Sequence, residues 1–351
     1  MPSSPSSEAF IAHDSIFVYN FAISAKLDPL GLHEDQTMPH FQGKQGDVPI
    51  EQAQIATTRL LAWQNDRLDS ADEPEIRAVR RDYDKAIGSF VARKANMVAA
   101  IPETNQVFET FLAAGIKPRA DFYDYSLGSI GREMTYSGDE KEAHLLNIFS
   151  SSIIAAHNGL YAVLRARHAL RQSNTDALKH LEQAIEESAR IQKAMADTYR
   201  QVGPDFVANE VTRYVGGVTH NAKKYEGPNA SHSGFMVLDR FVYGSFESLL
   251  ADNPALAKQF AYRQADLPDH LSVILDQADA EKDNQSIIEL AKNNMPEATE
   301  QARQLATSLR KTKVMHKSYA DKGLQAKGGS LSPDEPDVLS DTIIFTRNKE
   351  K

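Results

Sequence analysis

The chain of 351 residues contains no cysteine. Without a thiolate it can form no disulfide, no cysteine-ligated zinc site, no iron–sulfur cluster and no thiolate-ligated heme, and it has no cysteine nucleophile. A metal would therefore have to be held by His, Asp, Glu or Tyr side chains. The 11 histidines are then the main candidates for a nitrogen ligand.

Basic charge and long apolar runs are also scarce. Lys and Arg number 39 against 48 Asp and Glu, and the formal net charge of -9 argues against nucleic-acid binding, which needs clustered basic surface. The short basic runs Arg77 to Arg81 and Arg310 to Lys313 stand among acids and indicate solvated helix faces. No apolar run approaches the roughly 20 residues that cross a bilayer, and no secretory signal is visible. We expect a soluble, cytoplasmic protein that binds neither nucleic acid nor membranes.

The sequence also lacks the alternation of apolar and polar residues that is typical of β-strands, which never extends beyond a few residues. It contains no internal repeat. Helical patterns dominate instead, over residues 50–66, 74–99, 102–115, 140–171, 174–203 and 284–312. In the segment 140–171 apolar residues recur in steps of three and four, which predicts one buried helix face: Leu145, Phe149, Ile153, Ala156, Leu160 and Leu164. The next segment carries a similar stripe: Leu178, Leu181, Ile185, Ile191, Met195 and Tyr199. The predicted fold class is all-α.

Segments rich in Gly and Pro predict connections between these helices, over residues 121–138 and 215–234. A glycine-containing loop as long as the second one is often functional in a compact domain. Residues 1–50 are irregular and predict an N-terminal arm, packed on or extending from the body. Residues 51–351 then form a single helical domain, in which 51–120 could be a small subdomain.

Most catalytic signatures are missing, including G-x-x-x-x-G-K, G-x-G-x-x-G, G-x-S-x-G and H-E-x-x-H. The absence of any E-x-x-H argues against a diiron carboxylate site. His316 stands out because Val314 and Met315 precede it and four cations surround it: Arg310, Lys311, Lys313 and Lys317. A helical His in this setting suits a heme ligand, since cations can reach the anionic propionates. Gly328 and Gly329 follow, where a glycine loop could offer N–H groups to a carboxylate.

Four segments in the same order resemble the indoleamine dioxygenase superfamily, and within it the monodechloroaminopyrrolnitrin synthase-like heme proteins. YEGPNASHSGFMVLDRFVYGS is similar to the heme-pocket loop and its following helix. GDEKEAHLLNIFSSSIIAAHNGL resembles the distal-side helix and DTYRQVGPDFVANEVTRYV the substrate-side segment. MHKSYADK and KGGS resemble the proximal histidine segment and the closing loop. The resemblance covers residues 137–330, over half of the chain.

This resemblance implies a heme b whose iron is bound by His316. Lys313, Asn229 and Ala230 would contribute to cofactor binding, the latter two from the loop at the heme edge. The closing loop would cover the substrate with Gly328, Gly329 and Ser330. On the distal side the match offers Phe149, Ser150, Ser151 and Ser152 for substrate binding and catalysis, and helical phase does not choose among them.

One position departs from the dioxygenases. The arginine that holds the substrate carboxylate in those enzymes aligns with Thr212, and Arg213 stands next to it. A bidentate arginine supplies much of the orientation of a carboxylate, so tryptophan itself is in doubt as the substrate.

The implied function is a heme-dependent oxygenase or oxidoreductase acting with O2 or peroxide on an aromatic or indole-derived amino acid or amine, in specialised metabolism. The alternatives are a heme-dependent hydroxylase of a non-indole amino acid and a helical heme-binding or sensing protein without catalysis. A homodimer is left open.

Overall fold

The computed structural model describes residues 23–34, 36–43, 47–129, 135–225, 227–228, 233–254, 257, 260–261, 267, 269–280, 285–326 and 346. Its residue contacts group the chain into two compact units. The first unit comprises Met1–Ile16, Ser151–Arg200 and Ser231–Lys351, and the second comprises Phe17–Ser150 and Gln201–Ala230. Each unit therefore contains segments that are far apart in the sequence.

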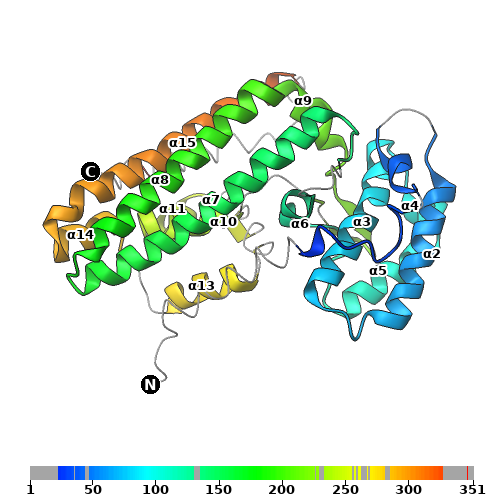
Figure 1. Cartoon of the computed structure of the whole chain (residues 1–351), viewed down its shortest axis with the longest axis horizontal. Coiled ribbons are helices and arrows are strands. Elements are labelled where there is room, and N and C mark those ends of the chain that lie inside the picture. Colours follow the sequence, from blue (N-terminus) through cyan, green and yellow to red (C-terminus); the bar gives the residue numbers. More distant parts are fainter. Residues whose placement is uncertain are drawn as a thin grey trace. The chain divides into compact units, whose positions relative to one another are not determined.

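The fold is predominantly helical, as the sequence predicts (Figure 1). The second unit contains η1 (Met38–Phe41), α2 (Ile50–Arg67), α3 (Glu73–Ala92), α4 (Met97–Ala100), α5 (Glu103–Ala113), α6 (Phe122–Ser126), η2 (Leu127–Ser129), α9 (Pro204–Asn209), η4 (Val211–Arg213), β1 (Val218–His220) and β2 (Lys223–Tyr225). The first contains α8 (Asp176–Asp197), α10 (Ser233–Tyr243), α11 (Glu247–Asp252), α13 (Asp269–Ala280), α14 (Ile287–Asn294), η5 (Pro296–Ala298) and α15 (Thr299–Ala326). Helix α7 (Glu140–Arg171) and the π-helical turn η3 (Thr198–Val202) run across the division between the units.

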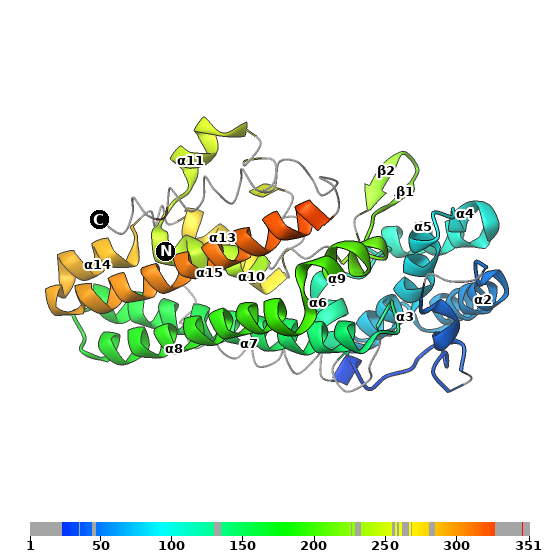
Figure 2. The ribbon, with the colours of Figure 1, turned by 90° about the horizontal axis from the view of Figure 1, so that it is seen from above.

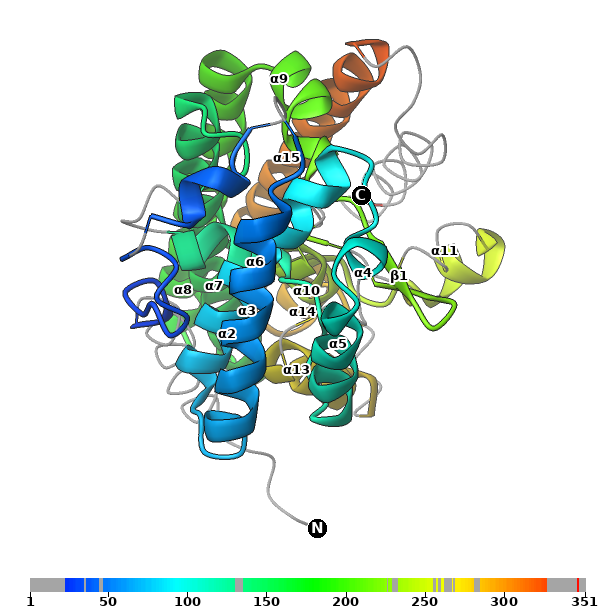
Figure 3. The ribbon, with the colours of Figure 1, turned by 90° about the vertical axis from the view of Figure 1, so that its right-hand side faces the viewer.

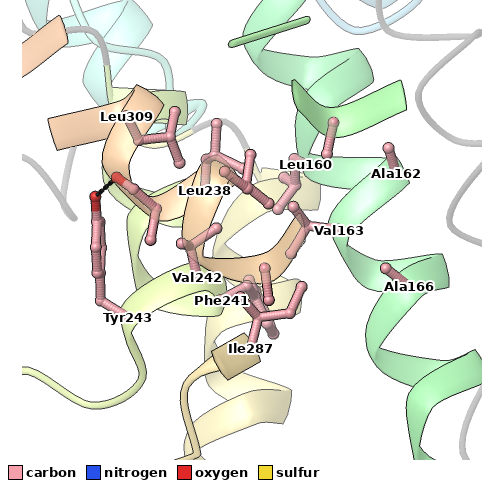
Figure 4. Packing of buried hydrophobic residues seen from close by; sticks show 14 of the residues in the cluster. Leu160, Ala162, Val163, Ala166, Leu238, Phe241, Val242, Tyr243, Ile287 and Leu309 are labelled. Atoms are coloured by element: carbon pink, nitrogen blue, oxygen red, sulfur yellow. Dashed lines mark hydrogen bonds between the residues drawn. The ribbon is translucent and has the colours of Figure 1, made fainter. Parts of the chain in front are cut away.

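Apolar faces of several helices form the core of the first unit. Helices α8 and α15 pack along each other, as Figures 1 and 2 show. Leu160 and Val163 of α7 belong to the same buried cluster as Leu238 of α10 and Leu309 of α15 (Figure 4). The Tyr243 hydroxyl donates a 2.6 Å hydrogen bond to the Ala306 carbonyl, so this buried phenol is satisfied. The stripe predicted for residues 140–171 is confirmed, because its members are buried or half-buried.

The helix predicted over residues 284–312 is interrupted, so that prediction is wrong. Helix α14 ends at Asn294, and α15 begins at Thr299 after a short 3-10 turn. The break falls at Met295, whose backbone has φ -154 and ψ 75. Pro296 is the cause, because the ring of a proline disfavours the α conformation in the residue before it.

In the second unit, helices α2, α3 and α5, which are labelled in Figure 3, contribute side chains to a separate apolar cluster. Leu60, Val79, Ile87 and Phe108 are fully or almost fully buried there. The segment 121–138, predicted as a connection, contains helix α6, which begins with a capping box between Asp121 and Asp124.

The predicted loop 215–234 contains the hairpin β1–β2, visible in Figure 2, in which Val218 pairs with Tyr225. This hairpin is the only sheet in the part of the chain that the structure describes. None of the described helices carries an apolar stretch long enough to cross a membrane.

Candidate functional site

His316 lies on the inward-facing stripe of α15. The stripe begins with Ala302, Leu305 and Leu309, which are fully buried, and continues through Thr312. Residues four apart share one helix face, so His316 follows Thr312 on the same side. The imidazole is half-buried, at the point along α15 where full burial gives way to partial exposure. His316 therefore lies where a bound group could contact both the imidazole and the buried side chains of the core.

Lys313, one turn before His316, forms a buried ion pair with α10. Its ammonium donates to Oδ1 of Asp239 over 2.7 Å, and the two side chains are 6% and 8% exposed. The same ammonium lies 4.3 Å from the centroid of the Tyr243 ring. Lys313 was predicted to help bind the cofactor, and a heme propionate at this position would have to compete with the carboxylate of Asp239.

Two tyrosines border the region after His316. Tyr319 is one turn further along α15, and its ring meets that of Tyr199 edge to face, with centroids 6.0 Å apart. The Lys322 ammonium contacts the Tyr199 hydroxyl and lies 4.7 Å from the ring centroid. Tyr199 belongs to the π-helical turn that ends α8, and it is 38% exposed. Single π-helical turns are frequent at functional sites.

The four residues predicted for the distal side point in different directions. The Phe149 ring packs against Phe122, with centroids 5.2 Å apart. The Ser150 hydroxyl is buried within hydrogen-bond distance of the Ser126 carbonyl at 2.9 Å and the Leu146 carbonyl at 2.8 Å. Ser151 is exposed, whereas Ser152 is buried. Ser150 has a single hydroxyl proton, and it is donated to these backbone carbonyls rather than to a ligand.

The structure separates the two residues predicted for substrate anchoring. Thr212 is half-buried in η4, and its hydroxyl donates to the Ala208 carbonyl over 2.6 Å. Arg213 is exposed. The remaining predicted site residues lie outside the described residues: Asn229, Ala230, Gly328, Gly329 and Ser330.

The basic run Arg77 to Arg81 was predicted to be a solvated helix face, and this is wrong. The side chains of Arg77 and Arg80 are only 14% and 11% exposed, and both pair with Asp124. The buried Lys313 contradicts the same prediction for the run Arg310 to Lys313. Arg81 is 1% exposed. Its guanidinium donates to backbone carbonyls of Ser24 at 2.8 Å, Gly128 at 2.9 Å and Leu27 at 3.1 Å. Five N–H donors allow one arginine to satisfy several loop carbonyls at once, which compensates for its burial.

Further along α3, Asp84 is the centre of a buried polar cluster that sequence reasoning missed. Its carboxylate accepts hydrogen bonds from the Arg119 guanidinium and the Tyr136 hydroxyl, and a third from the Ala120 N–H at 3.1 Å. Arg119 also donates to the Tyr214 carbonyl at 3.2 Å. Burial raises the pKa of the Tyr136 hydroxyl well above its ordinary value, and the charge of Asp84 adds to this effect.

Lys85 lies beside this cluster, and its side chain is enclosed by aromatic rings. Its ammonium is 3.7 Å from the ring centroid of Tyr136 and 5.1 Å from that of Tyr125, and the residue is 3% exposed. Glu142 accepts a 2.7 Å hydrogen bond from the Tyr125 hydroxyl. Burial lowers the pKa of Lys85 to about 8, although the negative charges of Glu142 and Asp84 oppose this shift. Perturbed groups of this kind gather at functional sites, although structural ion networks produce them too.

Gly88 was the one sequence signal that could have revealed the cluster. It lies in the interior of α3, one turn after Asp84, where glycine is otherwise unfavourable. A Cβ added there would meet the Tyr136 ring at 2.6 Å. The glycine therefore permits the close approach that brings Tyr136 to Asp84.

No protein-family model matches the chain, and no curated protein is significantly similar to it. The resemblance to heme proteins is confined to the four sequence segments described above.

Proposed function

We propose that the protein is a heme-dependent oxygenase or oxidoreductase that acts with O2 or peroxide on an aromatic or indole-derived amino acid or amine, in specialised metabolism. One observation carries the proposal: His316 is a half-buried imidazole that extends the inward-facing stripe of α15. The resemblance of the four segments to heme proteins supports the same assignment.

The residues around His316 fit a heme in part. The imidazole is a suitable axial ligand, and Tyr319 and Tyr199 provide an aromatic border one turn away. Lys313 fits less well, because Asp239 already neutralises its charge. When bound, a heme would supply the activation of O2 or peroxide. The chain itself would hold the iron through His316 and shield the site with the aromatic side chains.

The exposure of Arg213 narrows the substrate class. An exposed guanidinium cannot clamp a carboxylate inside a protein, and the hydroxyl of Thr212 is engaged with the Ala208 carbonyl. A substrate anchored by an arginine–carboxylate contact at this position is therefore disfavoured. We expect an aromatic amine, or an amino acid whose carboxylate is bound elsewhere.

Heme titration of the purified chain tests the proposal. Wild type should bind heme stoichiometrically with a Soret band, and the ferrous form should have the spectrum of a histidine ligand. His316→Ala should lose stoichiometric binding while its circular dichroism stays helical. His168→Ala, which removes an exposed histidine of α7, is the matched control and should bind as wild type does.

Two outcomes would contradict the assignment. Absence of a Soret band in the wild-type titration would show that the protein does not bind heme. A histidine-type ferrous spectrum retained by His316→Ala would transfer the ligand role to another histidine, with His157, His232 and His144 as the next candidates. If heme binds, O2 consumption and product analysis with tryptophan, tyrosine, chlorinated tryptophans and the corresponding amines then identify the substrate class.

A further inference from the structure

A second group of potential metal ligands lies in the second unit, far along the chain from His316. Asp28, His33 and Asp82 each offer one ligand atom, and these atoms all lie within 4.8 Å of one another. The Nε2 atom of His33 is 3.7 Å from Oδ1 of Asp82. Asp28 and His33 come from the loop before η1, whereas Asp82 belongs to α3.

Two buried atoms of this cluster lack hydrogen-bond partners within the described part of the chain: Nε2 of His33 and Oδ2 of Asp82. The Asp82 side chain is 0% exposed, and that of His33 is 25% exposed. A buried carboxylate oxygen without a partner costs free energy, because it has given up its hydration. The cost would be removed by a cation bound between these two atoms.

The carboxylates are held in place by other hydrogen bonds. Asp28 accepts from the backbone N–H of Leu32 and of His33, each at 3.0 Å, so the loop folds around its side chain. Oδ1 of Asp82 accepts from the Arg81 Nε at 2.9 Å, which leaves Oδ2 available. Metal ligands in proteins are commonly oriented by such outer hydrogen bonds. Arg81 is itself fixed by backbone carbonyls, so its charge stays on the side of Oδ1.

We infer that Asp28, His33 and Asp82 bind a divalent transition metal of the zinc class, which joins the loop 28–34 to α3. One imidazole and two carboxylates neutralise a dication and favour Zn²⁺ or Co²⁺ over Mg²⁺ or Ca²⁺, which prefer all-oxygen sites. Ligand atoms in a tetrahedral zinc site are roughly 3.4 Å apart. The three ligand atoms lie within 4.8 Å of one another, so binding would draw them together by up to about 1.4 Å.

The competing explanation is an ion pair without a metal. A protonated His33 imidazole could face Asp82, and Nε2–H would then point at the carboxylate. That arrangement predicts no affinity for zinc and no effect of zinc on stability. The metal site predicts both, so metal titration separates the two explanations.

The experiment uses the full-length chain without a histidine tag, stripped with a chelator and titrated with Zn²⁺ in a calorimeter. Co²⁺ serves as the spectroscopic probe, since its visible bands report tetrahedral nitrogen and oxygen ligation. We expect one Zn²⁺ per chain and a melting temperature that rises with zinc. His33→Gln should weaken binding by about tenfold or more and abolish the rise. His40→Gln, which alters an exposed histidine of η1, should behave as wild type does.

Asp82→Asn is a less direct variant, because it also disturbs the hydrogen bond from Arg81. The decisive variant is therefore His33→Gln, at a side chain that is partly exposed. Equal zinc affinity in wild type and His33→Gln would overturn the inference, and so would equal affinity of wild type for Mg²⁺ and Zn²⁺. His316→Ala should keep its zinc site. Zinc binding that survives a failed heme titration therefore supports this site independently of the proposed function.

Discussion

The ammonium of Lys313 and the carboxylate of Asp239 form a 2.7 Å hydrogen bond between α15 and α10. The two side chains are buried, and the bond ties α15 to α10 one turn before His316. Breaking it would loosen the contact between the two helices beside the proposed ligand His316.

Asp239→Asn should lower the free energy of unfolding by about 3 to 5 kcal/mol, because it leaves the Lys313 ammonium buried without its counter-charge. The measurement is urea denaturation followed by circular dichroism. The matched control is Asp321→Asn, which breaks the more exposed pair with Lys317 on the same helix, also 2.7 Å long. That change should cost less than about 1 kcal/mol. Similar losses of unfolding free energy in both variants would contradict the expectation that burial makes the Lys313–Asp239 pair the more costly one to break.

Lys85→Met should change how stability depends on pH. Burial lowers the pKa of Lys85 from 10.5 to about 8 in the folded protein. Between these two values the unfolded chain still binds the proton that the folded protein has released. The unfolded state then binds more protons, so the stability that wild type derives from this group rises with pH over that window. At pH values below the pKa of the folded state, Lys85 is charged in both states, and burial of its charge lowers the free energy of unfolding by the largest amount.

Relative to wild type, the free energy of unfolding of Lys85→Met should therefore be highest at about pH 7 and below, where the lysine is charged in both states. This advantage should shrink by roughly 2 kcal/mol between about pH 7 and about pH 10. Denaturant titrations of both proteins across this range give the difference directly, and the subtraction removes the titration of groups common to both. Parallel stability curves would show that the Lys85 amine keeps its ordinary pKa in the folded protein.

Gly88→Ala should destabilise the protein, although alanine normally stabilises a helix interior by roughly 0.5 to 1 kcal/mol. The added methyl would meet the Tyr136 ring at 2.6 Å and the Tyr214 carbonyl oxygen at 3.3 Å. Overpacking of this kind costs about 1 to 3 kcal/mol. In the matched control Gly159→Ala, the methyl would meet its nearest neighbour at 3.5 Å, an ordinary contact. The control should be as stable as wild type or more stable. Thermal unfolding of the two variants shows whether each substitution raises or lowers the melting temperature.

Arg213→Ala should leave substrate binding unchanged, because the guanidinium is exposed. The measurement is the shift of the Soret band when substrate is added to the heme-loaded protein. Thr212→Val removes the hydroxyl that donates to Ala208 and should lower stability by roughly 1 kcal/mol. A titration lost in Arg213→Ala but kept in Thr212→Val would show that Arg213 holds the substrate.

The sequence by itself determined the position of the longest helix, because helical periodicity is a local property. Residues 140–171 lack proline and carry apolar steps of three and four, and α7 has these bounds. The stretch 74–99, also predicted to be helical, is broken after Ala92, where α3 ends. The all-α class followed from the same pattern. Pro296 shows where the prediction was incomplete: the apolar stripe continues across it, whereas the backbone breaks before it.

Tertiary structure alone decided which charges are buried and what neutralises them. The run that contains Arg81 resembles a solvated face in sequence, since nothing local distinguishes it from one. Its burial depends on carbonyls at Ser24 and Gly128, which are 57 and 47 residues away in the chain. Asp84 and Arg119 meet across 35 residues for the same reason. A charge is stable inside a protein only with a partner, and chain topology, not local pattern, brings the partner to it.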